Sequence, residues 1–458
     1  MMKIEFYKIP MMIPIFIRNK IHNMLSDQKF IEIFTGSVWA LLARVVATLI
    51  SMATSIIIAR AYGADILGIM AVLSSVFMLA TIFTVLGTDT SILSLIPEHL
   101  TKYSPKSAFK VYRKIQCLVS IVSFFIGMLL YINSGFIANS IFFKPDLQFY
   151  FALSSVFIIF QALMVLNSKA VRSLRLIRTF AFIQLLPSLS KLIIIIPITL
   201  FFFHQDNPIY AMLASIAITA LIGIWIMDRV FKKISSKNIL YPVTIKEILN
   251  ISLPMFMTST MGFVIGQTGI IMLGIFRPEA EVGYYSIAVK ISTLTLFVIS
   301  AINTIAAPKF SELYHGEKID ELLYVARKSA KLIFWTTIPI LLLLILAGKS
   351  ILSLLFGPEF TIAYWAMVFL ALGQFVNSCS GSTEIFMNMT GGQNIFKNII
   401  FISMVVNIGM NFVLIPQYGM FGAAITGMVT TIVWNVAALL HIKIKFGKTI
   451  CYFPGFFN

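Results

Sequence analysis

The chain has 458 residues, of which 59% are hydrophobic and only 12% charged, and its mean hydropathy is +0.93. A soluble domain is about 25% charged, so this composition excludes a water-soluble fold and indicates that lipid is the solvent. The formal net charge of +17 is typical of nucleic-acid-binding proteins, but here the charges lie in short loops between apolar runs. Basic loops of this kind report membrane topology, and we expect no nucleic-acid partner.

Apolar runs of about 20 residues, each long enough to cross a bilayer, predict an all-α polytopic membrane protein with about twelve transmembrane helices. They follow a basic, partly apolar segment at 1–35, which we interpret as a cytoplasmic arm. The first six predicted spans are 37–58, 66–86, 115–132, 149–166, 180–202 and 209–227. The second six are 251–275, 284–305, 332–347, 362–387, 398–415 and 421–440.

The basic residues are distributed unevenly between the two sides of the predicted membrane. An even number of spans places both termini on one side, and that side carries 28 Lys and Arg residues. The opposite loops carry only Arg60, Lys144, Arg277 and Lys349. By the positive-inside rule, both termini are cytoplasmic, and we expect a multi-pass protein of the inner (cytoplasmic) membrane.

Two pairs of segments indicate an internal duplication. Residues 63–68 follow the first span as residues 278–283 follow the seventh, and residues 178–197 match 397–416 at a constant offset. A unit of six spans keeps its orientation when repeated, which predicts two parallel six-helix bundles around a central cavity and transport by alternating access. The predicted organisation is an arm at 1–35, bundles at 36–235 and 236–448, and a cytoplasmic tail at 449–458.

Five ionisable residues fall within the predicted spans or just past their ends: Arg44, Asp89, Lys191, Lys290 and Glu384. A charge at the bilayer centre costs about 2.5–3.5 kcal/mol on insertion scales, so such groups face a cavity, a partner or the interface. Four of them belong to polar stripes at helical spacing. The stripes are Arg44, Thr48, Ser51 and Ser55; Gln184, Ser188 and Lys191; Ser286, Lys290, Thr293, Ser300 and Thr304; and Asn377, Gly381, Glu384 and Asn388.

These stripes have two interpretations. They predict one water-filled, net-cationic cavity between the halves, in which Arg44, Lys191 and Lys290 bind an anionic headgroup and Asp89 and Glu384 are candidates for ion coupling. Ser and Thr stripes also hold transmembrane helices together without any transport role. Outside the spans, Arg172, Arg175 and Arg178 are topology anchors that can also attract an anionic headgroup at the cavity entrance.

The sequence carries no signature of an enzyme or of a metal site. Cys117, Cys379 and Cys451 have neither paired spacing nor a nearby His cluster. Gly348-Lys349-Ser350 lacks the upstream glycine of a phosphate-binding loop, because Leu343 occupies that place. We therefore expect no catalytic residues, no metal and no cofactor.

Several short motifs give the chain a family resemblance. They are Gly36-Ser-Val-Trp39 followed by Arg44, Ile58-Ala-Arg60-Ala-Tyr-Gly63-Ala-Asp-Ile-Leu-Gly68, Ile96-Pro97-Glu98, and Asn411-Phe-Val-Leu-Ile-Pro416-Gln-Tyr-Gly419-Met-Phe-Gly422-Ala-Ala424. Together they resemble the polysaccharide repeat-unit (O-antigen-type) flippases of the multidrug/oligosaccharidyl-lipid/polysaccharide exporter superfamily. The resemblance runs from about Gly36 to the end of the twelfth span, and the last motif is the most specific.

The resemblance implies two six-helix bundles that form a V and move polyprenyl-pyrophosphate-linked oligosaccharides between leaflets for polysaccharide biosynthesis. It also implies membrane lipids, a polysaccharide polymerase and glycosyltransferases as partners. Arg44 matches the family's basic position in the first span, whereas Lys191, Lys290 and Glu384 come from the polar stripes alone. The chain departs from the family pattern at Gly68-Ile-Met, where an aromatic residue usually follows the glycine.

Three alternatives remain open at this stage. A drug/cation antiporter of the same superfamily would need an acidic cavity, and a peptidoglycan-precursor flippase commonly has two further helices. A membrane-embedded glycosyltransferase or polymerase would need a large outside loop or a pair of catalytic carboxylates. The lipid-linked oligosaccharide flippase agrees best with a cationic cavity, because Arg and Lys are the natural partners of pyrophosphate.

Overall fold

The computed structural model describes residues 28–234 and 244–454, and within these ranges the chain is helical and contains no strand. In these two ranges, eleven segments are long and apolar enough to cross a membrane. The first of them, Trp39–Val85, holds two of the predicted spans, because 47 residues of helix would extend about 70 Å, more than twice the thickness of the hydrocarbon core. The prediction of an all-α protein with about twelve spans is confirmed.

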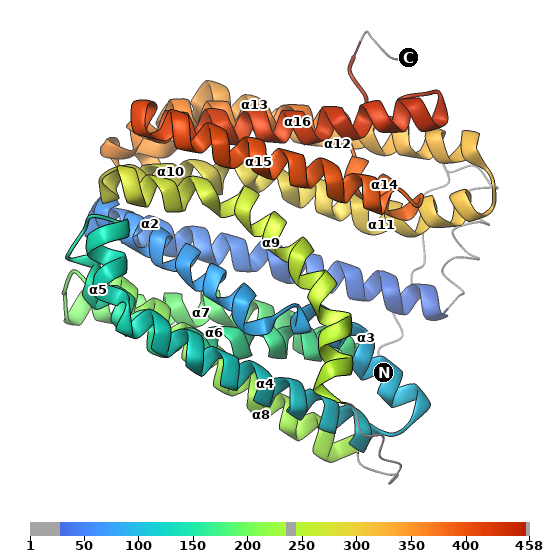
Figure 1. The fold of residues 1–458 in the computed structure, drawn as a ribbon. Helices are drawn as coiled ribbons and strands as arrows, with labels where there is room; N and C mark the ends of the chain where they lie inside the picture. Colours follow the sequence, from blue (N-terminus) through green and yellow to red (C-terminus); the bar gives the residue numbers. More distant parts are fainter. Residues whose placement is uncertain (1–27, 235–243, 455–458) are drawn as a thin grey trace, which may run out of the picture.

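Helix α2 (Gln28–Val85) turns back on itself at Gly63, whose backbone (φ 82°, ψ −178°) is not helical. Figure 1 shows its first limb crossing the molecule and its second limb returning. We call the end of the molecule at this turn the Gly63 end, and the opposite end, where α2 begins, the basic end. The helix begins inside the predicted arm, of which residues 1–27 lie outside the described part of the chain.

The helices that follow α2 form two groups, the N half and the C half (Figure 1). The N half is completed by α3 (Thr88–Lys102), α4 (Pro105–Ile132), α5 (Ser134–Phe136), α6 (Leu147–Ser173), α7 (Ile177–Phe201) and α8 (Asn207–Ile234). The C half holds α9 (Ile245–Phe276), α10 (Glu279–Ser292), α11 (Leu296–His315), α12 (Ile319–Leu355), α13 (Tyr364–Ser380), α14 (Thr383–Met389), α15 (Gln393–Tyr418) and α16 (Met420–Phe446).

Local sequence signals fix several helix starts at the basic end. The hydroxyl of Ser104 accepts a hydrogen bond from the backbone of Ser107, and Pro105 occupies the first turn of α4. Helix α9 begins with a capping box between Thr244 and Glu247. At both starts these partners satisfy backbone N–H groups that have no acceptor within the helix.

Two predicted spans are interrupted. The span at 284–305 consists of α10 and α11 joined by a single 3₁₀ turn at Thr293–Thr295. The span at 362–387 breaks at Gly381 (φ 72°, ψ −141°), where a Cβ would lie 2.6 Å from that of Ala330. The continuous polar stripe predicted from Asn377 to Asn388 is therefore wrong, because its second part lies on the separate helix α14.

The halves meet at the Gly63 end through a reciprocal glycine contact between α2 and α10. A Cβ on Gly68 would overlap the carbonyl oxygen of Glu279, and a Cβ on Gly283 would overlap that of Ala64. In the predicted repeat Gly68 corresponds to Gly283, and Ala64 to Glu279. The contact is thus self-complementary, as expected for two copies of one unit related by a twofold axis.

Polar contacts reinforce this end. Lys144 donates a 2.6 Å hydrogen bond to the carbonyl of Arg277 and forms a 3.2 Å ion pair with Glu279. Arg60 of α2 donates to the carbonyls of Leu354 and Leu355, at the end of α12. These contacts all join the N half to the C half.

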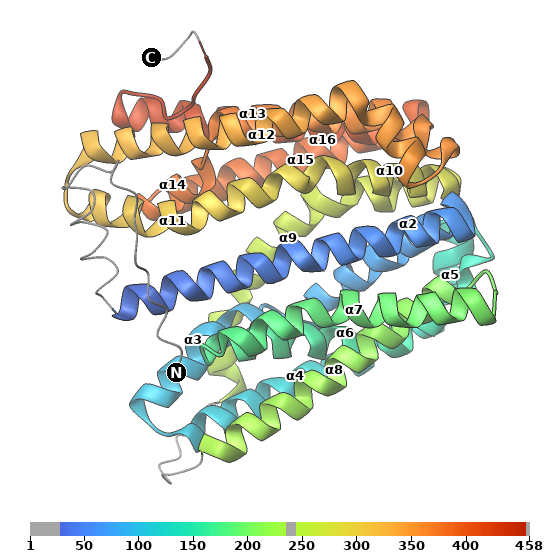
Figure 2. The same cartoon turned by 180° about the vertical axis from the view of Figure 1, so that it is seen from behind.

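Toward the basic end the two groups of helices diverge, and α9 crosses from one to the other (Figures 1 and 2). Near its start, Ser252 of α9 shares a 2.7 Å hydrogen bond with Ser91 of α3, and at mid-length Gln267 accepts one of 2.9 Å from Ser75 of α2. Near its end, α9 leads to Arg277, which donates to the carbonyls of Ile415 and Pro416 in the C half. Helix α9 therefore links both halves along its length.

The glycine contact predicts a specific cost of substitution. Gly68→Ala or Gly283→Ala should lower the free energy of unfolding by about 1–3 kcal/mol, because the added methyl group overlaps a backbone carbonyl that cannot rotate away. Thermal unfolding in detergent measures this. Gly262→Ala is the control, since a Cβ added at this position of α9 would meet no heavy atom within 4 Å. Equal behaviour of all three variants would contradict the tight contact.

Candidate functional site

The three basic residues predicted within spans come from three different helices and all lie on or beside the first limb of α2. Arg44 belongs to this limb, Lys191 to α7 and Lys290 to α10. Helices α7 and α10 both pack against α2. The fold thus brings together residues that are far apart in the sequence.

Lys290 connects the two halves at mid-depth. Its ammonium donates to the carbonyl and hydroxyl of Ser51, at 2.7 and 2.8 Å, and to the hydroxyl of Ser55, at 2.7 Å. An ammonium has three protons, so these three bonds satisfy it completely. The predicted stripe of α2 therefore faces a cation of the C half.

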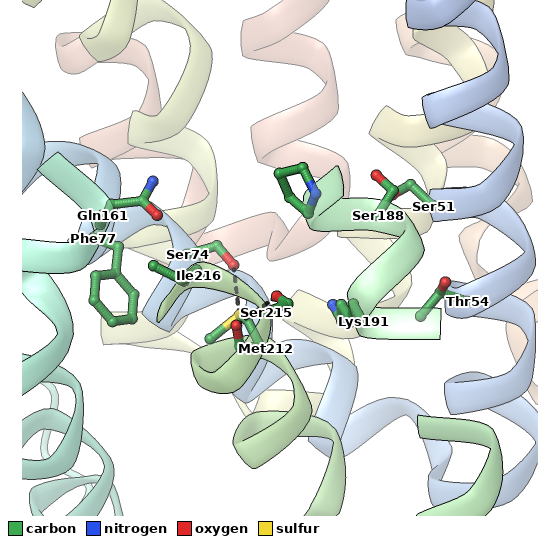
Figure 3. A pocket seen from close by; sticks show the side chains of 11 residues that line it. Ser51, Thr54, Ser74, Phe77, Gln161, Ser188, Lys191, Met212, Ser215 and Ile216 are labelled. Carbon is green, nitrogen blue, oxygen red and sulfur yellow. Dashed lines mark hydrogen bonds between the residues drawn. The ribbon is translucent and has the colours of Figure 1, made fainter. Parts of the chain in front are cut away.

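Lys191 lies in a cavity of about 200 Å³ whose lining residues all belong to the N half. They come from both limbs of α2 and from α6, α7 and α8: Ser51, Thr54, Ser74, Phe77, Gln161, Pro187, Ser188, Lys191, Met212, Ser215 and Ile216. Figure 3 shows Ser51, Thr54 and Ser188 on the side of Lys191, with Gln161 and Phe77 across from them. The lining contains one cation and no carboxylate.

The sequence missed part of this lining. Ser188 and Lys191 were found from their spacing, but Gln161, Ser74 and Ser215 lie on spans without an ionisable residue. A glutamine within an apolar span stands out in the sequence. Of these three residues, Gln161 could therefore have been predicted from the sequence. Met212 contributes a thioether that accepts a 3.4 Å hydrogen bond from Ser74.

Arg44 lies on the exposed face of α2, nearer to the basic end than Lys191 and Lys290. Its guanidinium lies 6.0 Å from the ring centroid of Phe297 on α11, a cation–π contact across the two halves. Among the described residues it forms no ion pair or hydrogen bond.

The two acidic candidates lie apart from the basic group. Asp89 is half-buried in α3, which follows the first spanning segment, and Glu384 is exposed on α14. Burial raises the pKa of the Asp89 carboxyl above its usual range, while the ammonium of Lys169 opposes this shift. Neither carboxyl lines the cavity, so the structure does not place them with the cations.

The three arginines at the basic end are all exposed. Arg172 lies near the end of α6, with its guanidinium 5.9 Å from the ring centroid of Phe180. Arg175 lies in the turn before α7 with a positive φ of 57°, and Arg178 lies on the first turn of α7. Their position agrees with topology anchoring and leaves their side chains accessible.

Buried amides hold the C half together. Asn435 of α16 donates to Asn377 of α13 at 3.3 Å and accepts from Thr383 at 3.2 Å, and Asn407 of α15 donates to Thr430 of α16 at 3.0 Å. Hydrogen bonds of this kind join transmembrane helices. Asn377 therefore has a packing role. Over 28–234 and 244–454, no group of His, Cys, Asp and Glu side chains is arranged to hold a metal ion.

A family model described as "Polysaccharide biosynthesis protein" matches residues 65–365, more than half of the chain. The chain belongs to this family. The family resemblance inferred from the short motifs is confirmed.

Two curated relatives match about half of the chain. The "Probable low-salt glycan biosynthesis flippase Agl15" of Haloferax volcanii is 25% identical over 51% of this chain and 48% of its own length. The "Capsular polysaccharide biosynthesis protein CapF" of Staphylococcus aureus is 26% identical over 49% of this chain and 57% of its own. Each match spans only about half the length of the relative.

Solved structures share the fold. An inward-facing multidrug resistance transporter of the MATE family and MOP superfamily superposes with a TM-score of 0.69 at 15% identity, covering 90% of this chain and 98% of the other. The lipid II flippase MurJ, in an inward closed conformation, gives a TM-score of 0.69 at 17% identity, covering 90% and 89%. At these identities the likeness concerns the fold alone.

The Lys290 contact predicts a coupling between the two halves. In the double variant Ser51→Ala/Ser55→Ala the ammonium keeps only the Ser51 carbonyl, and we expect the free energy of unfolding in detergent to fall by about 1.5–3 kcal/mol. In a Lys290→Met background the same two changes should cost less than about 0.5 kcal/mol.

Ser286→Ala is the control for this cycle, because the Ser286 hydroxyl lies on α10 but donates to the carbonyl of Gly283 in its own helix. An equal cost of the serine changes with and without Lys290 would show that the contact contributes nothing to stability.

Proposed function

We propose that the protein is a flippase that moves polyprenyl-pyrophosphate-linked oligosaccharide units across the cytoplasmic membrane by alternating access. The observation that carries this proposal is the arrangement of Arg44, Lys191 and Lys290 around the first limb of α2, with no carboxylate in the adjoining cavity. Pyrophosphate is an anion, and Arg and Lys are its preferred partners. Membership of the polysaccharide biosynthesis family supports the same substrate class.

Each half would carry part of this task. In the proposed path the headgroup enters at the basic end, passes Arg172, Arg175 and Arg178, and reaches Arg44. The polyprenyl tail remains in lipid. Lys290 holds the halves together until the headgroup draws it away from the hydroxyls of Ser51 and Ser55. The chain acts as a transporter and not as an enzyme.

An electrical driving force is available for this direction of transport. When one negative charge leaves an inside-negative cell, its free energy falls by about 2.3 kcal/mol per 100 mV of membrane potential. Asp89 and Glu384 remain candidates for ion coupling, and the raised pKa of Asp89 is the feature that keeps it in consideration. A polymerase and glycosyltransferases would act on the same glycan before or after its passage.

A drug/cation antiporter is less well supported. Such a protein must attract cations between its halves, whereas the charged residues gathered on or beside the first limb of α2 are Arg44, Lys191 and Lys290. Electrostatic repulsion by these three residues opposes the entry of an organic cation.

Glycan export tests the proposed function. In a strain that lacks the gene, the wild-type chain should restore surface glycan, and Arg44→Ala should reduce it at least tenfold, with lipid-linked units accumulating on the cytoplasmic face. Arg229→Ala is the matched control, because Arg229 lies over Trp225 on the N half, away from α11. Membrane levels of all variants are compared, and Asp89→Asn and Glu384→Gln test ion coupling in the same assay.

The outcomes separate the candidates. Full export with Arg44→Ala would leave Arg44 as a packing residue on Phe297. If the deletion strain keeps its surface glycan and becomes more sensitive to drugs, the flippase function is refuted and the antiporter function is supported.

The proposed location places the basic end and both termini in the cytoplasm. Alkaline phosphatase, which is active only outside the cytoplasm, should be inactive when fused to the C-terminus and active when fused between α7 and α8 at residue 204. The opposite pattern would invert the topology and with it the direction of transport.

A further inference from the structure

The lining residues of the cavity around Lys191 come from the N half alone, and one of them, Ser51, also receives Lys290 of the C half. Its volume of about 200 Å³ is below the ~300–1,000 Å³ of pockets that take drug-sized ligands. An oligosaccharide does not fit into it. A single small ion does, and Figure 3 shows the side chains that would surround it.

The cavity gathers hydrogen-bond donors that have no acceptor. The Lys191 ammonium and the Ser188 hydroxyl form no hydrogen bond with any described residue. The hydroxyl oxygen of Ser51 accepts a hydrogen bond from Lys290, and the hydroxyl proton of Ser51 remains free to donate. Gln161, across the cavity, has a buried side-chain carbonyl oxygen that accepts no hydrogen bond from any described residue.

The other hydroxyls of the lining are already committed. Thr54 donates to the carbonyl of Ile50 and Ser215 to that of Met212, each within its own helix. The free donors are therefore confined to one side of the cavity, where Figure 3 shows Ser188 beside Ser51 and Lys191 on the same side. An ammonium with two hydroxyl donors and no carboxylate is a set of groups that attracts an anion and repels a cation.

Electrostatics favour occupation of the cavity. Lys290 donates to Ser51, a residue that also lines the cavity of Lys191, so the two positive charges face the same region. Lys290 is satisfied by Ser51 and Ser55, but Lys191 has no counter-charge among the described residues. An unpaired charge in a low-dielectric region is costly, and a bound anion would offset both the desolvation of Lys191 and its repulsion from Lys290.

We propose that the N-half cavity binds one small anion, of phosphate size or smaller, held by Lys191, Ser188 and Ser51. The shared chemistry admits two sources, a free inorganic anion such as chloride or phosphate, and a phosphate group of a lipid carrier. The site itself follows from the cavity and its donors, and only the second source rests on the proposed function.

Anion binding to the full-length purified protein tests this site. Labelled chloride or phosphate is measured by equilibrium dialysis in detergent, with gluconate as the replacing anion at constant sodium and ionic strength. The wild-type chain should bind saturably, with a matching rise in the temperature of half-unfolding. Lys191→Met should raise the dissociation constant at least tenfold, whereas Lys191→Arg, which keeps the charge, should stay within about threefold of wild type.

Lys349→Met is the matched control, because Lys349 is a lysine of the C half that lies over Tyr364 and outside the cavity. It should bind the anion as wild type does. Absence of saturable binding, or equal binding by wild type and a folded Lys191→Met, would overturn the proposal and leave a cavity filled by water.

Farnesyl pyrophosphate, a short soluble polyprenyl pyrophosphate, distinguishes the two sources. If farnesyl pyrophosphate displaces the labelled anion, the site takes the headgroup of a lipid carrier. If the labelled anion stays bound, the site takes an inorganic anion. The two proposals can fail separately. If Lys191→Met loses anion binding but the wild-type gene does not restore glycan export, the anion site is supported and the flippase function is refuted.

Discussion

An ammonium in the hydrocarbon region needs hydrogen-bond acceptors, and Lys290 obtains all of its acceptors from the opposite half of the molecule. In lipid, helices gain no hydrophobic energy by associating, so close packing and hydrogen bonds must hold the halves together. The three bonds to Ser51 and Ser55 do this at mid-depth, and the glycine contact of Gly68 and Gly283 does it at the Gly63 end. A motion that separates the halves at the Gly63 end must break the glycine contact.

The two halves repeat a backbone arrangement but differ in their interior chemistry. Their reciprocal contact at Gly68 and Gly283 has the symmetry of a duplicated unit. In the C half, buried side chains such as Asn377 and Asn435 bond to one another and leave their helices tightly joined. In the N half, the donors around Lys191 lack acceptors and line a cavity. The two halves thus share a reciprocal backbone contact but differ in the polar side chains of their interiors.

The sequence by itself determined the solvent, the fold class and most of the spans. Long apolar runs leave a chain no alternative to membrane helices, because every backbone group in lipid must be bonded within the segment. The same composition signal could not detect the break at Gly381 or the 3₁₀ turn at Thr293–Thr295, since both lie within apolar runs. The family followed from short motifs, and the match over 65–365 confirmed it.

The grouping of the polar residues was decided by the tertiary structure. Helical spacing correctly gave the stripe of Ser51 and Ser55, but only the packing of α10 on α2 shows that it receives Lys290. Spacing likewise found Lys191, yet the cavity needs Gln161 and Ser215 from two other helices. Periodicity along one helix reports which face is polar, whereas the partner of that face depends on contacts between residues far apart in the chain. The sequence therefore supplied the charged groups, and the packing of the helices decided which of them are satisfied and which remain free to bind.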